Sequence, residues 1–324
     1  MNNRVSTILL AGILVSLIFS CNSDSQTLSG KNTDGSGKEK KLKGTVSISG
    51  AFALYPLVNV WAEEFRKEYP DVRFNISGGG AGKGMADVLG GAADLGMFSR
   101  DVTDAEREKG AWWISVTKDA VIPTLSEKNP LLGKIKTEGL TREELSGYFL
   151  KDGKKVWPNS TTEVNVYTRS DASGAADVWA KYLGGDAQES LKGIAVYGDP
   201  GLADAVKNDP KGIGYNNIIY VFDLNSGEKY PGIEVVPIDI NENGGIDPEE
   251  DFYHNLDEIT AAIADGRYPS PPARELYMIA KGKPTDPIIL EFLNWILVKG
   301  QVFVEANGYI LLSETVINEQ KKKL

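Results

Sequence analysis

The sequence contains only one cysteine and one histidine among its 324 residues. A single thiol cannot form an internal disulfide bond, which excludes a disulfide-stabilised scaffold. His254 lies in a polar stretch, so a histidine-based catalytic dyad has little support. Beyond the first 21 residues, no apolar run reaches the ~20 residues that a transmembrane helix needs.

Basic residues are also in deficit, because 35 Lys and Arg stand against 45 Asp and Glu and give a net charge of −10. Nonspecific nucleic-acid binding depends on neutralising phosphates with a basic face, so the charge argues against it. Any anion site in this chain must therefore be formed by a few residues rather than by a broad basic face. The hydrophobic content of 41% is enough to build one large or two moderate domains.

The first 21 residues have the features of a signal peptide. Arg4 supplies the positive start, residues 8–19 are almost wholly apolar, and Ser20 and Cys21 close the segment. Residues 18–21 resemble the lipobox of bacterial lipoproteins, in which the cysteine is lipidated and becomes the N-terminus; Phe19 departs from the residue usual there. We expect Cys21 to be the attachment point, and polar residues 22–44 to be a flexible tether.

From residue 45 onward, short β-rich runs alternate with segments of helical periodicity, which predicts an α/β protein with a parallel sheet. Ligands of open α/β sheets bind beyond the carboxyl ends of the strands. Residues 50–53, 78–84 and 99–100 lie at such ends. Further along, residues 218–222 are an apolar run that we expect to form another strand.

Residues 78–84 contain five glycines and open into a predicted helix. Glycines let backbone N–H groups approach a ligand closely, and a helix N-terminus attracts negative charge, so this loop is typical of an anion site. A nucleotide-binding loop would need glycine at Ser77 and a hydroxyl residue at Gly84, and both positions fail. The alternative is a flexible surface loop.

A second loop repeats this arrangement, since Arg169 follows a predicted strand and precedes a predicted helix. Arg169 offers a fixed fork of donors to an oxyanion, and Ser173 with the amides after it would complete the coordination. The alternative for Arg169 is a surface or interdomain ion pair.

These motifs, in this order, resemble the phosphate-binding proteins that serve ABC importers. The resemblance covers residues 45–313 and rests on residues 50–56, 80–84, 93–100, 169–175, 212–215 and 308–309. It implies an anion held by residues of four loops: Ala51, Phe52, Ala53, Gly80, Ala81, Gly82, Lys83, Ser99, Arg100, Arg169, Ser173, Gly174 and Ala175. The family usually carries hydroxyls at the positions of Ala51, Phe52, Ala53, Ala81 and Ala175, so several hydrogen bonds to an oxyanion are missing here.

The resemblance also implies a type II periplasmic-binding fold, with two α/β lobes, each a mostly parallel sheet flanked by helices, and the ligand in the cleft between them. We expect lobe I at residues 45–121 and 274–324, and lobe II at residues 122–273. The chain would be a monomeric binder rather than an enzyme, lipid-anchored in the bacterial cell envelope and facing the periplasm. It would deliver inorganic phosphate or a similar oxyanion to an ABC permease.

Two other functions stay open at this point. One is a sensor or scaffold lipoprotein whose cleft is degenerate, which the missing hydroxyls favour. The other is a phosphoryl-transfer or hydrolytic enzyme, which the failed nucleotide-loop spacing and the lack of an evident nucleophile and base disfavour.

Residues 239–250 match the twelve-residue EF-hand loop, with Gly244 at the sixth position and Ile246 at the eighth. The predicted calcium ligands are Asp239, Asn241, Asn243, the Gly245 carbonyl, Asp247 and Glu250. A predicted strand precedes the loop, so we expect an isolated EF-like loop that holds a structural Ca²⁺. The alternative is an Asn-Gly-rich turn with solvated acids.

Overall fold

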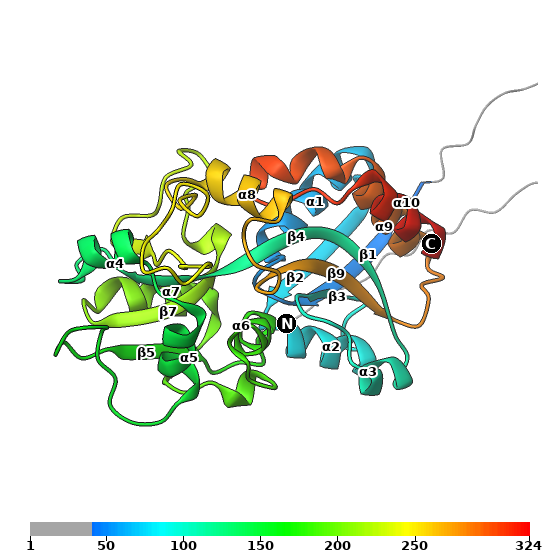
Figure 1. Cartoon of the computed structure of the whole chain (residues 1–324). Helices are drawn as coiled ribbons and strands as arrows, with labels where there is room; N and C mark the ends of the chain where they lie inside the picture. The colour runs from blue at the N-terminus through cyan, green and yellow to red at the C-terminus, as the bar shows by residue number, and fades with distance from the viewer. Residues whose placement is uncertain (1–40) are drawn as a thin grey trace, which may run out of the picture. The chain divides into compact units, whose positions relative to one another are not determined.

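The computed structural model describes residues 41–324. The predicted signal peptide, Cys21 and nearly all of the tether lie outside the described residues. The described residues form two groups of helices and strands (Figure 1). Strand β4 (Ala111–Ser126) crosses from one group into the other, and β9 (Ala273–Lys281) pairs with its first half. We call these groups lobe I and lobe II.

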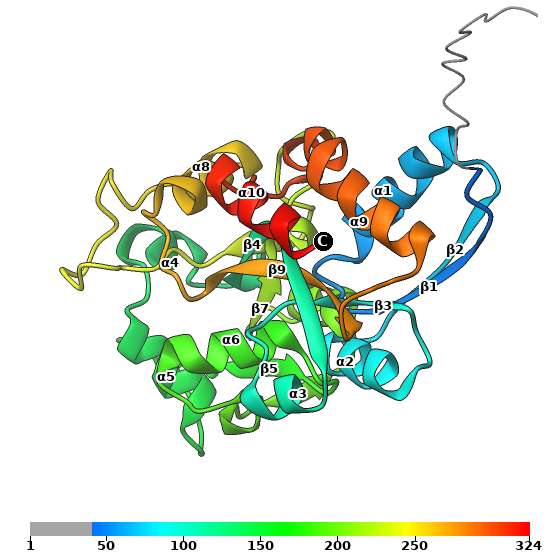
Figure 2. The same ribbon diagram turned by 90° about the vertical axis from the view of Figure 1, so that its right-hand side faces the viewer.

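Lobe I contains a five-stranded sheet in the order β2-β1-β3-β9-β4. Its other strands are β1 (Gly44–Gly50), β2 (Val72–Gly78) and β3 (Leu95–Phe98). Helices α1 (Tyr55–Glu68) and α9 (Pro287–Val298) cover one face and α2 (Ala81–Gly90) covers the other (Figure 2). Two further helices belong to the lobe: α3 (Asp104–Glu108) and α10 (Glu314–Lys323).

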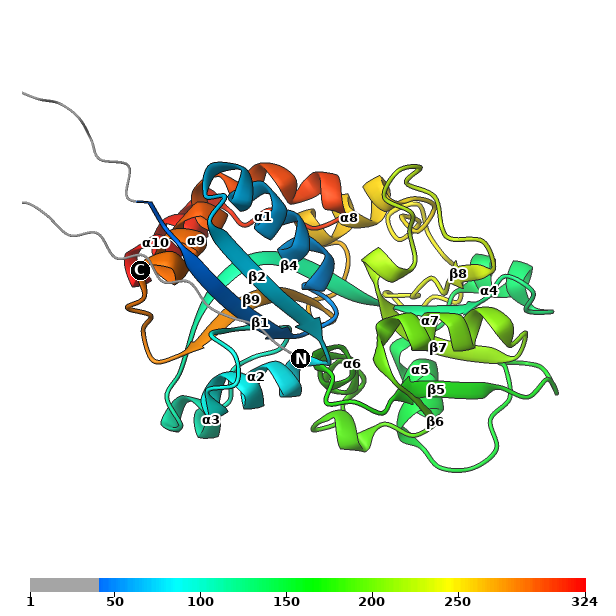
Figure 3. The ribbon, with the colours of Figure 1, turned by 180° about the vertical axis from the view of Figure 1, so that it is seen from behind.

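Lobe II is built on the second half of β4 and four further strands: β5 (Asn165–Arg169), β6 (Ile194–Val196), β7 (Gly212–Asn217) and β8 (Ile233–Val235). Five helices surround them: α4 (Leu132–Glu138), α5 (Arg142–Leu150), α6 (Gly174–Leu183), α7 (Gly198–Asn208) and α8 (Leu256–Asp265). Strand β7 runs antiparallel to β4, which enters from lobe I, and β5 and β6 run in the same direction as β7. The carboxyl ends of these three strands therefore point back toward lobe I (Figure 3).

The sheets are more mixed than the mostly parallel sheets that the sequence predicts. In lobe I, β1 pairs in parallel with β2 and β3, but β9 pairs antiparallel with β3 and β4. In lobe II, β5 is parallel to β6 and β7, but β4 is antiparallel to β7 and β8. The reason is that β4 leaves lobe I and β9 returns to it, so the two strands must run in opposite directions.

The transition between lobes falls inside β4, which pairs with β9 up to Ala120 and with β7 from Val121. Next to it, Arg274 donates from Nε to Asp119 Oδ1 at 2.8 Å, and its Nη2 contacts Asn217 at the end of β7. Burial raises the pKa of Asp119 although Arg274 opposes that shift. A buried ion pair therefore ties both crossing strands to lobe II.

Two helix starts depend on residues close together in the chain. Thr103 and Thr141 cap α3 and α5 with capping boxes through Glu106 and Glu144. Residues 218–222, predicted as a strand, instead contain the 3₁₀ helix η2 (Ile218–Tyr220). Within residues 41–324, no single helix is long and apolar enough to cross a membrane, although α9 and residues 300–307 together pass that test as a bent pair.

Candidate functional site

The structure brings the predicted loops of the two lobes into direct contact. Gly82 at the start of α2 donates its N–H to the carbonyl of Ala172 at 2.9 Å. A Cβ atom at Gly174, the first residue of α6, would lie 2.3 Å from Oγ of Ser99. A Cβ atom at Gly80 would lie 2.5 Å from Oδ2 of Asp171. Close approach of the lobes therefore depends on glycine at these positions.

Arg169 is the last residue of β5, and its side chain is 1% exposed. Its Nε and Nη2 donate to the two oxygens of Asp171, the first at 2.7 Å, and its Nη1 donates to Asp199. Burial by itself lowers the pKa of Arg169, but Asp199 and Asp171 outweigh that effect and the net shift is upward. The guanidinium is therefore charged. Its ion pairs are buried and lie within lobe II, so they are neither the surface pair nor the interdomain pair considered as the alternative.

The loop after Arg169 is held by a second set of hydrogen bonds. Asp171 Oδ1 also accepts from the backbone N–H of Gly198 at 3.0 Å. Gln188 bridges the loop by donating to the Asp171 carbonyl and accepting from the Ser173 N–H, both at 2.7 Å. Ser173 Oγ accepts from Ala176 N as the N-cap of α6, so its hydroxyl hydrogen can still be donated.

Phe52 brings an aromatic ring to the place where the family resemblance implies a hydroxyl. The ring centroid lies 5.5 Å from the guanidinium carbon of Arg169. A Cβ atom at Gly78 would lie 2.7 Å from this ring, and one at Gly198 would lie 3.3 Å from it. Tyr197 meets the ring edge-on at 5.9 Å. The ring therefore spans the contact between the two lobes.

Two tyrosines hold the backbone of the same turn. Tyr220 of lobe II donates its hydroxyl to the Phe52 carbonyl at 2.9 Å, and Tyr309 donates to the Ala53 carbonyl at 2.8 Å. Burial raises the pKa of Tyr220 far above its ordinary value, so the hydroxyl keeps its proton. Ala51 and Ala53 are buried, and their methyl groups add no hydrogen bond.

Lys83 and Arg100, the other predicted cations, are paired within lobe I. Lys83 Nζ contacts Asp87 one helical turn along α2. Arg100 donates to both oxygens of Glu106 at 3.0 and 2.7 Å. Burial by itself would raise the pKa of Glu106, but Arg100 lowers it below its ordinary value. Neither cation is paired with the Arg169 loop. Ala81 of lobe I and Ala175 of lobe II are buried and offer only methyl groups.

Two acidic residues of the site were not singled out from the sequence. Asp171 stands two residues after Arg169, and Asp199 lies in the first turn of α7 directly after β6. A pattern in the sequence could have pointed to Asp199. It lies where strand β6 ends and helix α7 begins, as the other loops of the site lie between a strand and a helix.

The predicted calcium loop has its ligand side chains close together. Asn241 Nδ2 and Asn243 Nδ2 both donate to Asp247 Oδ2, at 2.9 and 2.8 Å. Asp239 Oδ2 accepts from Gly244 N at 2.8 Å, and Glu250 Oε1 accepts from Asn241 N at 2.9 Å. The carboxylates thus bond to amides of the loop, and no group of three or more His, Cys, Asp or Glu residues within 41–324 is arranged around a metal position.

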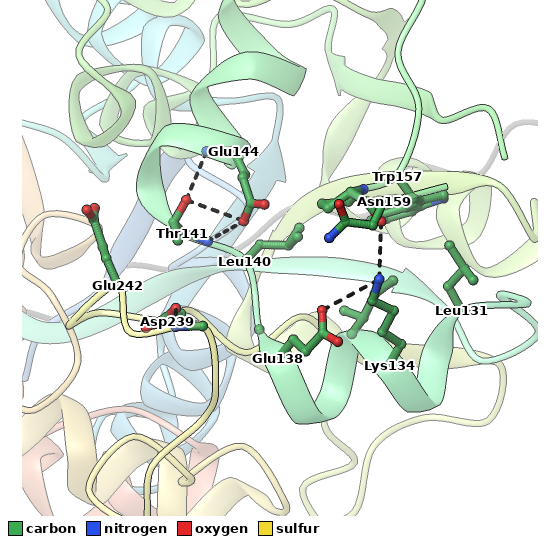
Figure 4. A pocket seen from close by; sticks show the side chains of 14 residues that line it. Leu131, Lys134, Glu138, Leu140, Thr141, Glu144, Trp157, Asn159, Asp239 and Glu242 are labelled. Atoms are coloured by element: carbon green, nitrogen blue, oxygen red, sulfur yellow. Dashed lines mark hydrogen bonds and ion pairs between the residues drawn. The ribbon is translucent and has the colours of Figure 1, made fainter. Parts of the chain in front are cut away.

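The same loop is anchored on lobe II. Ile246 donates its N–H to the Thr137 carbonyl at 2.9 Å, and its side chain packs over Gly139, whose added Cβ would lie 2.5 Å from it. Asp239 and Glu242 border a pocket of about 300 Å³ between this loop, α4 and Trp157 (Figure 4).

Comparisons with known proteins agree with the architecture. The phosphate-binding protein PstS of Bacillus subtilis strain 168 is 26% identical over 318 residues, which cover 96% of this chain and 95% of that protein. PstS of Pseudomonas aeruginosa PAO1 is also 26% identical, over 89% of both chains.

Solved structures show the same fold. A phosphate-bound structure from Clostridium perfringens matches with a TM-score of 0.67 at 21% identity, covering 83% of this chain and 100% of that one. An ABC-type phosphate transport receptor from Vibrio cholerae matches with a TM-score of 0.60 at 18% identity, covering 83% of this chain and 100% of the receptor. The PBP superfamily domain matches residues 35–299, which is most of the sequence. The chain therefore belongs to the PBP superfamily.

Proposed function

We propose that this chain is an extracytoplasmic solute-binding protein that captures inorganic phosphate, or a closely similar oxyanion, for an ABC importer. The observation that carries the proposal is the buried guanidinium of Arg169 at the junction of the two lobes. Three of its N–H groups are used by Asp171 and Asp199, and a guanidinium has further N–H donors beyond these three. Relatives over nearly the full length are named phosphate-binding proteins, which supports the same ligand.

Groups from both lobes would contact the anion. Arg169 supplies the positive charge, and Asp171 holds the guanidinium side-on so that its orientation is set before the anion arrives. Ser173 and the Gly174 amide donate from lobe II, while the loop of residues 80–84 and Ser99 close from lobe I. Each charge-assisted hydrogen bond contributes about 1.5–3 kcal/mol, so the missing hydroxyls lower affinity rather than remove the site.

We place the protein at the cell envelope, anchored by a lipid on Cys21 and facing the periplasm, with an ABC permease as its partner. Cys21 lies outside the described residues. The lipid anchor is proposed from the sequence of residues 1–21, and the permease partner from a structural relative that is named an ABC-type phosphate transport receptor.

Isothermal titration calorimetry with phosphate, arsenate, sulfate and organophosphates tests the function. We expect saturable binding of phosphate by the full-length chain and no release of inorganic phosphate from the organophosphates. Absence of binding to every oxyanion would favour the sensor or scaffold alternative. Steady turnover of an organophosphate would favour the enzyme.

A structural Ca²⁺ in residues 239–250 is a second proposal. It is favoured by the convergence of the third, fifth and ninth loop positions, Asn241, Asn243 and Asp247, and by the burial of Asp239 and Glu250. Rotation of an asparagine amide by about 180° exchanges its oxygen and nitrogen, so both amides can present oxygen to a cation. Calcium would supply the counter-charge that these buried carboxylates lack among their hydrogen-bond partners, which are loop amides.

Calcium is expected to raise the melting temperature of the wild-type protein. At a free concentration of 100 times the Kd, a site adds about 2.7 kcal/mol, which corresponds to a shift of roughly 5 °C for a chain of this size. Glu250→Gln should remove the shift, whereas the control Glu249→Gln, at an exposed neighbour that is not a predicted ligand, should keep it. Equal wild-type melting temperatures with calcium and with chelator would contradict the site.

A further inference from the structure

We infer that Asp199 is a built-in competitor for the ligand, so that an oxyanion binds by displacing its carboxylate from Arg169. This inference rests on the proposed function. It makes Asp199 a residue that lowers the affinity for the ligand, whereas Arg169, Asp171 and Ser173 raise it.

The two carboxylates on Arg169 are held very differently. Asp171 takes two parallel bonds from Nε and Nη2 of the guanidinium, and a third from the Gly198 N–H. Asp199 takes one bond, from Nη1. Its other oxygen has only a contact of 3.5 Å with the Asn217 N–H, at the limit of a hydrogen bond. Asp171 thus positions the guanidinium, and Asp199 is the partner that a ligand can replace.

The backbone of Asp199 is fixed independently of its carboxylate. Its carbonyl accepts from Asn216 Nδ2 at 3.2 Å, and the residue lies in the first turn of α7. Rotation of the side chain alone would therefore free Nη1 of Arg169 without moving the helix. In that arrangement Nη1 becomes available to a ligand oxygen next to the remaining N–H capacity of the guanidinium.

The formal charges of the cluster also predict that Asp199 opposes anion binding. Arg169 contributes one positive charge and the two aspartates contribute two negative charges, and all three side chains are at most 4% exposed. The buried cluster has a formal charge of −1, so an arriving anion meets net repulsion and must compete with a carboxylate already in place. A neutral side chain at position 199 removes both obstacles.

The test compares two isosteric changes on the same guanidinium, Asp199→Asn and Asp171→Asn, by calorimetric titration with phosphate. Asp199→Asn is expected to bind phosphate roughly tenfold more tightly or better, the factor that one charged hydrogen bond typically represents. Asp171→Asn, which loosens the guanidinium, is expected to weaken binding by at least a similar factor. Asp199→Ala must also bind more tightly than wild type, and melting curves without phosphate check that each variant is folded.

The outcomes separate this inference from the proposed function. If wild type binds phosphate and both Asp199 variants bind equally or less tightly, the inference is wrong and the function stands. If wild type binds weakly and Asp199→Asn binds well, the competition is supported. If neither wild type nor any folded variant binds an oxyanion, both the function and the inference are wrong.

Discussion

Replacing Arg169 with methionine is expected to abolish phosphate binding and to destabilise the protein. Both effects have the same cause, because the change removes the only cation within residues 41–324 that bonds to the buried carboxylates of Asp171 and Asp199. Breaking a buried ion pair by removing one partner costs roughly 3–5 kcal/mol, since an uncompensated buried charge is left behind. Calorimetric titration measures the loss of binding, and urea unfolding measures the loss of stability.

A triple variant separates the two effects. Arg169→Met combined with Asp171→Asn and Asp199→Asn carries no buried charge at this position, so its stability should recover while binding stays lost. Arg267→Met is the control, because Arg267 is a partly exposed arginine that pairs with Asp265 and is not a predicted ligand, and it should bind phosphate within a few-fold of wild type. Phosphate binding by Arg169→Met at wild-type strength would place the anion elsewhere.

Replacing Gly174 with valine is expected to prevent the lobes from closing while each lobe remains folded. A Cβ atom at this position would lie 2.3 Å from Oγ and 2.6 Å from the carbonyl oxygen of Ser99, a distance that real Cβ atoms do not reach. The contact joins the start of α6 in lobe II to the end of β3 in lobe I. Overpacking of this kind costs about 1–3 kcal/mol, so we expect the affinity for phosphate to fall roughly 10- to 100-fold.

Small-angle X-ray scattering provides the second readout, since wild type should contract when phosphate is added and Gly174→Val should not. Gly147→Ala is the control, because an added Cβ in α5 meets no atom of another described segment within 4 Å. It should leave both binding and contraction unchanged. If Gly174→Val still contracts and binds normally, the contact between Ser99 and Gly174 is not part of the ligand-bound state.

Local patterns predicted a large part of this structure. The alternation of β-rich and helical runs from residue 45 is present, and the helices predicted after residues 78–84 and after Arg169 are α2 and α6. Each of these depends on residues within a few positions of one another, so one sequence window contains all the interacting groups. The same reasoning located the loops of residues 78–84 and 169–175 at strand ends, and the structure brings them together.

Tertiary contacts overrode the local pattern elsewhere. Residues 218–222 have the composition of a buried strand, but Ile218–Tyr220 form a 3₁₀ helix that presents Tyr220 to the carbonyl of Phe52. The antiparallel pairing of β9 with β3 and β4 likewise joins segments far apart in the chain. Strand direction depends on the route of the whole chain between the lobes, which no local window contains.

The sequence by itself determined the alternation of β-rich and helical segments, the strand-end loops and the presence of Arg169 at one of them. The tertiary structure alone decided which charges meet there. Asp199, 30 residues away, became a partner of Arg169, while Lys83 and Arg100 were paired with Asp87 and Glu106 inside lobe I. The physical reason is that hydrophobic periodicity acts over a few turns of the chain. Charge pairing depends instead on distance in space and on burial, and not on separation along the chain.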